Sequence, residues 1–156
     1  SVYARFGFSD ILTCLLALDA YVELYHGGMV PIKEFAARPV HRDDRDILVR
    51  VVIKKDGRKA AYISQRNSST DFPLLAVCAA NLGNQWFVSI GARPAKAALV
   101  EFTEDNFDTI KEMAKQAADA VSYGDNTRGS GQYRHSLAVV YVRRLMERLK
   151  GRSVSR

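Results

Sequence analysis

The sequence has few cysteines and no long apolar run. Cys14 and Cys78 are the two cysteines among 156 residues. Each lies in an apolar stretch without a Cys or His at metal-ligand spacing, so we interpret both as reduced core residues typical of a cytoplasmic protein; a disulfide between them stays open. No apolar run approaches the roughly 20 residues that span a bilayer. The start, Ser1 to Arg5, lacks a signal-peptide core, and the absence of Met favours a chain that begins partway into a longer product.

The sequence also lacks the common catalytic and nucleotide-binding motifs. It has no HExxH, no Walker loop and no GxGxxG. None of its three histidines, His26, His41 and His135, falls in a motif with a nucleophile, which favours surface or turn roles. The stretch Gly129-Ser130-Gly131 precedes a predicted helix and offers amide groups to an anion; a flexible connector is the favoured interpretation. The residues by themselves predict no self-contained active site.

Positive charge is concentrated at one end of the chain. The net charge is +6, and from residue 143 onward six basic residues stand against Glu147, which gives +5. The remaining body is therefore near neutral, and no aromatic residue follows Tyr141. A basic tail without stacking residues argues against a nucleic-acid partner. Nucleic-acid binding through this tail is kept only as the weakest alternative.

The periodicity of apolar residues predicts an α+β fold. A helix follows Ser9, and residues 103–121 and 132–149 have helical spacing, the last helix ending at Gly151. Strands are predicted at 21–25, 29–32, 47–53, 60–64, 74–80, 86–90 and 97–100, with a loop at 33–46 and hairpin turns at 26–28, 55–58 and 83–84. Strands segregated from helices indicate antiparallel sheets rather than a doubly wound fold.

Four segments, in order, resemble one known family. They are Phe8-Ser9-Asp10 running into residues 15–24; residues 30–35 followed by Asp46-Ile47-Leu48; residues 89–97 (SIGARPAKA); and Asp125 with residues 128–134 (RGSGQYR) and 139–145. Together they are similar to the FAD-binding subunit of the xanthine dehydrogenase and carbon monoxide dehydrogenase family of molybdenum hydroxylases.

The resemblance implies two domains and an electron-transfer role. Residues 1–56 correspond to the second half of the FAD-binding domain, an antiparallel or mixed sheet with an N-terminal helix. Residues 57–156 correspond to a small C-terminal domain with a three-stranded antiparallel sheet and two to three helices. In the family, FAD passes electrons between iron–sulfur clusters on one partner subunit and an acceptor. Hydroxylation occurs at a molybdenum cofactor on another subunit.

Three positions correspond to flavin contacts in the family. Asp10 matches an acidic residue that contacts the flavin, and its alternative role is a favourable charge at a helix start. Leu48 matches an apolar residue near the isoalloxazine ring, and Ile63 stands where some members carry a flavin-contacting Lys. That polar contact is then lost or made by a neighbour such as Arg66. Arg128, Tyr133 and Arg134 are expected to tie the last helix to the sheet or to a neighbouring chain.

The glycine-containing loops that hold the FAD diphosphate in the family have no counterpart in this sequence. Converging amides are needed to bind the two phosphates. We therefore expect this chain alone to bind FAD weakly or not at all, and to lack turnover of its own. The alternative is a non-catalytic assembly module that docks the missing N-terminal FAD subdomain or the partner subunits. Exposed apolar surface around Phe6, Phe8 and Leu12 would serve that docking or a homodimer.

Overall fold

Helices and strands follow one another in an order close to the predicted one. The computed structural model describes residues 2–3, 7–38 and 46–151. The elements are α1 (Asp10–Ala17), β1 (Tyr21–Leu24), β2 (Gly28–Pro31), α2 (Ile32–Ala37), β3 (Leu48–Val52), β4 (Lys59–Gln65), β5 (Leu75–Leu82), β6 (Gln85–Gly91), β7 (Ala98–Thr103), a 3₁₀ turn (Glu104–Asn106), α3 (Ile110–Asp119) and α4 (Gly131–Leu149).

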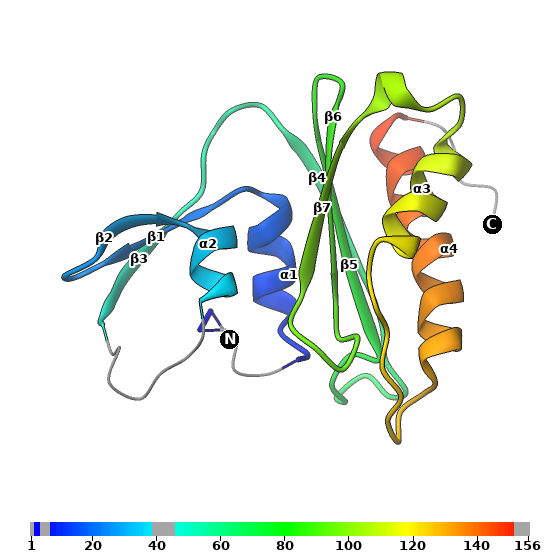
Figure 1. Cartoon of the computed structure of the whole chain (residues 1–156), viewed down its shortest axis with the longest axis horizontal. Helices are drawn as coiled ribbons and strands as arrows, with labels where there is room; N and C mark the ends of the chain where they lie inside the picture. Colours follow the sequence, from blue (N-terminus) through cyan, green and yellow to red (C-terminus); the bar gives the residue numbers. More distant parts are fainter. Residues whose placement is uncertain (1, 4–6, 39–45, 152–156) are drawn as a thin grey trace.

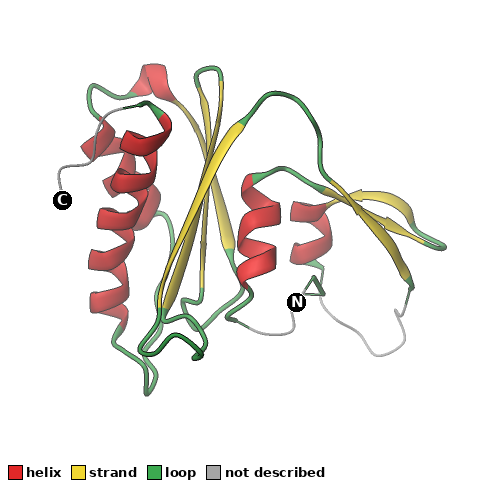
Figure 2. Ribbon diagram, turned by 180° about the vertical axis from the view of Figure 1, so that it is seen from behind, coloured by secondary structure: helices red, strands yellow, loops and turns green. Residues whose placement is uncertain are grey.

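Sheets and helices form alternating layers (Figure 1). A three-stranded antiparallel sheet of order β2-β1-β3 lies beside α1 and α2. A four-stranded antiparallel sheet of order β4-β5-β6-β7 comes next, and α3 and α4 cover its other face, as Figure 2 shows from behind. The α+β class predicted from the sequence is confirmed.

The two central strands of the larger sheet are buried along nearly their whole length. β5 and β6 are covered by α1 on one face and by α4 on the other, which explains their nearly continuous apolar sequence. Their hairpin turns at Gly83, whose φ of 62° suits a residue without a Cβ. Trp86 is fully buried on β6, and its indole N–H donates to Glu104 at 3.2 Å.

The first helix packs against both sheets. Leu12, Leu15 and Leu16 join the apolar cluster of the smaller sheet and α2, while Ala17 packs on the larger sheet. α1 approaches β6 so closely that a Cβ on Gly91 would lie 2.1 Å from Oγ1 of Thr13. The position of α1 is therefore fixed by contacts with both sheets.

The predicted hairpin between residues 47–53 and 60–64 is wrong. β3 pairs with β1, whereas β4 pairs with β5 from Lys59–Asn81 to Gln65–Leu75. Residues 55–58 therefore carry the chain from one sheet to the other, and the second sheet has four strands instead of the predicted three. A turn-forming sequence permits a hairpin, but pairing depends on which apolar faces can be buried together.

Two helical segments also differ from the prediction. The expected loop at 33–46 begins with α2, which buries Ile32 and Ala36, one turn apart, against the smaller sheet. The helix expected from residue 103 starts at Ile110, where Thr109 and Glu112 form a capping box. Satisfied amide donors at a cap define a helix start more sharply than apolar spacing does.

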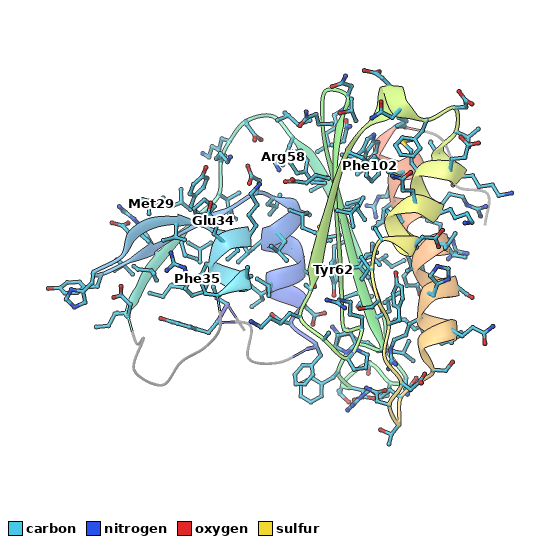
Figure 3. The ribbon with its side chains drawn as sticks, in the orientation of Figure 1. Met29, Glu34, Phe35, Arg58, Tyr62 and Phe102 are labelled. Carbon is cyan, nitrogen blue, oxygen red and sulfur yellow. The ribbon has the colours of Figure 1, made fainter. Side chains whose placement is uncertain are left out.

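The exposed apolar surface lies only partly where the sequence suggested, at Ile11, which is 53% exposed, and at Phe72, which is 51% exposed. Leu12 is fully buried, and the Phe8 ring packs on Phe72 with centroids 4.0 Å apart; Phe6 is outside the described residues. Large exposed apolar side chains instead gather at the smaller sheet and its ends, at Tyr25, Met29, Ile47, Val49 and Ile53. We call these five residues the sheet patch; Met29 is labelled in Figure 3.

Two further predictions concern membrane-spanning segments and the basic C-terminal tail. In the described ranges, no helix is both long and apolar enough to cross a bilayer. Residues 152–156 of the basic tail lie outside the described part, and Lys150 just before them forms an ion pair with Glu104.

Candidate functional site at the start of α1

The first turn of α1 presents the carboxylate of Asp10. Ser9 caps the helix, because its hydroxyl accepts the Leu12 N–H at 3.1 Å. Asp10 is thereby held at the positive end of the helix dipole. Its side chain remains 37% exposed, so the carboxylate can accept a hydrogen bond from a molecule outside the chain.

Tyr62 and Arg66 hold this carboxylate from the edge of the larger sheet. The Tyr62 hydroxyl donates to Oδ1 of Asp10, and Nη2 of Arg66 lies 2.6 Å from Oδ2. Figure 3 shows Tyr62 on the part of β4 beside α1, with Arg58 nearer the other end of the helix. There Arg58 donates to the carbonyl of Ala17 at 3.0 Å. The orientation of Asp10 is therefore set by groups on β4 and just after it.

The polar cluster extends from Arg66 toward the C-terminal half. Arg66 donates to the backbone oxygen of Asp71 at 2.6 Å, and Arg128 contacts the Asp71 carboxylate at 3.1 Å. The Arg128 guanidinium also lies 5.6 Å from the centre of the Phe72 ring. The cluster thus combines two arginines, two carboxylates and exposed aromatic surface.

The environment keeps the phenol of Tyr62 neutral and the carboxyl of Asp71 charged. Burial, followed by the hydrogen bond to Asp10, raises the pKa of Tyr62. The hydrogen bond from Arg128, followed by that from the Phe72 amide, lowers the pKa of Asp71. Tyr62 is consequently a hydrogen-bond donor to Asp10 throughout the physiological pH range.

The structure does not bring the three sequence-predicted residues together. Leu48 begins β3, where it pairs with Leu24 and packs on the apolar cluster of the smaller sheet. Ile63 packs on the opposite side of β4, against the core formed with α3 and α4. Asp10 instead meets Tyr62, the residue before Ile63. Successive side chains of a strand point to opposite faces, so strict alternation along β4 could have identified Tyr62.

The glycine-rich connector before α4 is a structural element. The Gly131 amide donates to the Asp125 carboxylate at 2.5 Å, and Gly129 exchanges backbone hydrogen bonds with Asn126. Arg134 is fully buried and donates to the carbonyls of Leu74, at 2.9 Å, and Gly129, at 2.6 Å. The prediction that arginines here tie the last helix to the sheet is confirmed for Arg134. Tyr133 is half exposed.

Within the described residues, the histidines and the groove beside α2 do not form a second candidate site. His26 lies in the β1–β2 turn, His135 contacts the Asp119 carboxylate at 2.7 Å, and His41 is outside the described residues. In the ranges that the structure describes, no three His, Cys, Asp or Glu side chains gather as metal ligands. A groove of about 360 Å³ between α2 and β7 is bordered by Lys33, Lys96 and Glu101. Lys33 already contacts Glu101, and Lys96 donates to the carbonyl of Ala36 near the end of α2.

The fold is similar to that of chains in solved oxidoreductases. This chain superposes on a chain of quinoline 2-oxidoreductase from Pseudomonas putida 86 with a TM-score of 0.76 and 19% identity, covering 97% of this chain and 60% of that one. For a cyanide-inactivated Cu,Mo-CO dehydrogenase the TM-score is 0.75, with 16% identity and coverages of 97% and 60%.

A third structure gives the same result. It is the carbon monoxide dehydrogenase from Hydrogenophaga pseudoflava that lacks the Mo-pyranopterin moiety of the molybdenum cofactor; the TM-score is 0.72 at 16% identity, with 98% of this chain and 60% of that chain covered. At these identities the similarity establishes the fold, and the chain spans 60% of the length of these relatives. No family model and no curated protein sequence matches the chain.

Proposed function

We propose that this chain is part of the FAD-carrying subunit of a molybdenum hydroxylase-type oxidoreductase. The observation that carries the proposal is a likeness over almost the whole chain, 97%, to a chain of quinoline 2-oxidoreductase. Carbon monoxide dehydrogenase chains share the same fold. The four sequence segments that resemble the FAD subunit of this enzyme class support the same assignment.

In this role the chain supplies scaffold and one polar contact to the flavin. Asp10 is the contact, since its carboxylate is partly exposed and is oriented by Tyr62 and Arg66. Flavin, when bound, supplies the redox chemistry, passing electrons between iron–sulfur clusters on one partner subunit and an acceptor. The molybdenum cofactor belongs to another partner. Leu48 and Ile63 contribute through packing of their strands. We place the assembly in the cytoplasm because both thiols are free.

The described residues do not fit the diphosphate of FAD. Two candidate glycine segments are already satisfied internally: Asp46 accepts the amides of His26 and Gly27, and Asp125 accepts that of Gly131. Without free converging amides the phosphates lack donors. We therefore propose that the chain needs the N-terminal FAD subdomain to hold the cofactor, and that it has no turnover by itself.

A flavin titration tests this dependence. Purified chain is added to FAD while flavin fluorescence is followed, and we expect no saturation at micromolar protein. Saturation in that range would show a complete flavin site within this chain and would contradict the proposal.

Recovery of the assembly from its own cells tests the assignment itself. A tagged copy of the chain is purified, and iron, molybdenum and flavin are measured in the same fraction. We expect all three, with Asp10→Asn lowering flavin but leaving iron and molybdenum unchanged. The matched control is Asp108→Asn, at an exposed acidic residue just before α3, which should leave all three unchanged. A fraction without molybdenum and iron would refute the assignment.

The sheet patch favours a second candidate, a non-catalytic docking module. Its Tyr25 and Ile47 are each 68% exposed, which is more than expected for large apolar side chains on a surface that binds no other protein. Val49→Asp on β3 should then abolish recovery of the partner subunits or of a homodimer in size-exclusion chromatography. Tyr133→Asp, at a similarly exposed residue on α4, is the control. Equal recovery with both variants would exclude docking through this patch.

A further inference from the structure

The two cysteines of the chain meet between α1 and β5. Cys14 is half-buried on α1, one turn after Asp10, and Cys78 is buried on β5. Both pack in one small cluster with Ala17, Ala80 and Phe87, and Cys78 is the largest influence on the pKa of the Cys14 thiol. Residues 64 apart in sequence are thus held in contact by the packing of the helix on the sheet.

Polar groups surround this pair on the helix-facing side of the larger sheet. Tyr62 is the cross-strand neighbour of Cys78 on β4, and Ser89 is its neighbour on β6. The Ser89 hydroxyl is buried and, in the described part of the chain, has no hydrogen-bond partner. A thiol pair flanked by a phenol and an unsatisfied hydroxyl differs from a purely apolar core contact. The two hydroxyl groups can form hydrogen bonds with an oxidised cysteine such as a sulfenic acid.

The two thiols differ in their readiness to ionise. Interaction with Cys78 lowers the pKa of Cys14, while interaction with Cys14, followed by burial, raises the pKa of Cys78. The first proton therefore leaves Cys14, which is also the more exposed thiol. A nucleophilic thiolate next to a second thiol is the arrangement of a redox-active pair.

We propose that Cys14 and Cys78 form a reversible disulfide that links α1 to β5 when the chain meets hydrogen peroxide. The Cys14 thiolate attacks the terminal peroxide oxygen, the O–O bond breaks, and the leaving hydroxide takes a proton to become water. Cys14 is then a sulfenic acid. The Cys78 sulfur attacks it, the S–O bond breaks, and hydroxide leaves with the Cys78 proton as a second water. Two thiols are oxidised and one hydrogen peroxide is reduced to two waters.

The disulfide fixes the helix that presents Asp10. Cys14 lies one turn from Asp10 on α1, and Tyr62, which binds Asp10, neighbours Cys78. A covalent link at this point holds α1 against β5, next to the edge strand β4 that carries Tyr62. The inference does not depend on the proposed flavin role, because it concerns the thiols alone and is read out by mass.

Intact mass spectrometry of the wild-type chain tests the proposal. Folded protein is treated with hydrogen peroxide, denatured, alkylated without reductant and weighed. We expect a monomer about 2 Da lighter with no alkyl group added, one linked peptide containing both cysteines after digestion, and full recovery of two alkylatable thiols after dithiothreitol. Two alkylatable thiols after peroxide, or a disulfide-linked dimer as the main product, would overturn the proposal.

Two variants separate the roles of the thiols. In Cys78→Ala the reaction should stop at Cys14, which gains one or two oxygens. In Cys14→Ala the buried Cys78 should stay reduced, because it lacks the more exposed partner that reacts first. Oxidation of Cys78 at the wild-type rate in Cys14→Ala would also overturn the proposal. The wild-type result stands without the variants, so their folding does not decide the test.

Discussion

Asp10 on α1 accepts a hydrogen bond from Tyr62 on β4, 52 positions later in the chain. This bond joins the first turn of a helix to the edge strand of the larger sheet, and Arg66 reinforces it from just beyond the strand. The carboxylate that the sequence identified as a flavin contact is therefore positioned by residues that belong to a different predicted domain.

Removing the Tyr62 hydroxyl should destabilise the fold modestly. Tyr62→Phe keeps the ring and deletes the donor to Asp10, which retains Arg66. We expect a loss of about 1 kcal/mol in the free energy of unfolding, measured by urea denaturation. Tyr25→Phe is the control, since Tyr25 is 68% exposed. Equal losses in both variants would show that the bond contributes nothing.

Stability should fall at alkaline pH because two tyrosines resist ionisation in the folded chain. Burial raises the pKa of Tyr62 and of Tyr123 above the ordinary tyrosine value of about 10. Above about pH 10 the unfolded state loses these protons first, so the folded state binds more protons and the free energy of unfolding decreases as pH rises. Urea denaturation midpoints measured in buffers from pH 8 to about pH 11 test this decrease in stability. Replacing both tyrosines by Phe should flatten the decline; an unchanged slope would assign it to other groups.

Gly91 should be intolerant of any side chain while Thr13 faces it. A Cβ at Gly91 would overlap the Thr13 hydroxyl oxygen, at 2.1 Å, so Gly91→Ala should cost about 1–3 kcal/mol through strain. Thr13→Ala in the same chain removes the overlapping atom and should restore part of that loss. The double-mutant cycle measures this coupling.

The control for this cycle is Gly124→Ala, whose added Cβ would meet its nearest atom at 3.6 Å. We expect Gly124→Ala to be close to neutral. Strict additivity of Gly91→Ala and Thr13→Ala would mean that the contact between α1 and β6 is looser than the structure indicates.

Arg134 should be essential for the fold. Its buried guanidinium donates to three carbonyls and to the Asn126 side chain. Arg134→Met leaves these acceptors without a donor, and we expect a loss of about 3–5 kcal/mol. Arg144→Met, at an exposed position on the same helix, should change stability little. Arg134→Lys should rescue poorly, because one ammonium cannot reach acceptors spread around a planar fork.

Local signals in the sequence predicted most of the elements but not how the strands pair. Ser9 as a cap, the turn at Gly83 and the end of α4 at Gly151 were all identified, because each depends on the conformational preference of one or two residues. The hairpin at 55–58 was wrong, and α2 was missed. A six-residue helix leaves too short an apolar pattern to separate it from a loop.

The candidate site was predicted only in part, because local signals do not show which side chains from distant segments meet. Asp10 was identified, and Arg66 was considered as a neighbour. Ile63 was placed with them although it faces α3 and α4. The roles of Asp10, Leu48 and Ile63 as flavin contacts stay predictions.

The sequence by itself determined the α+β class, the succession of helices and strands, and the absence of familiar catalytic motifs, because these follow from periodicity and local preferences. Only the tertiary structure decided that β4 joins β5, that Tyr62 meets Asp10, and that Cys14 packs in one cluster with Cys78. Each of these contacts joins residues well separated in the chain, and the last two form because α1 buries apolar side chains against two sheets at once.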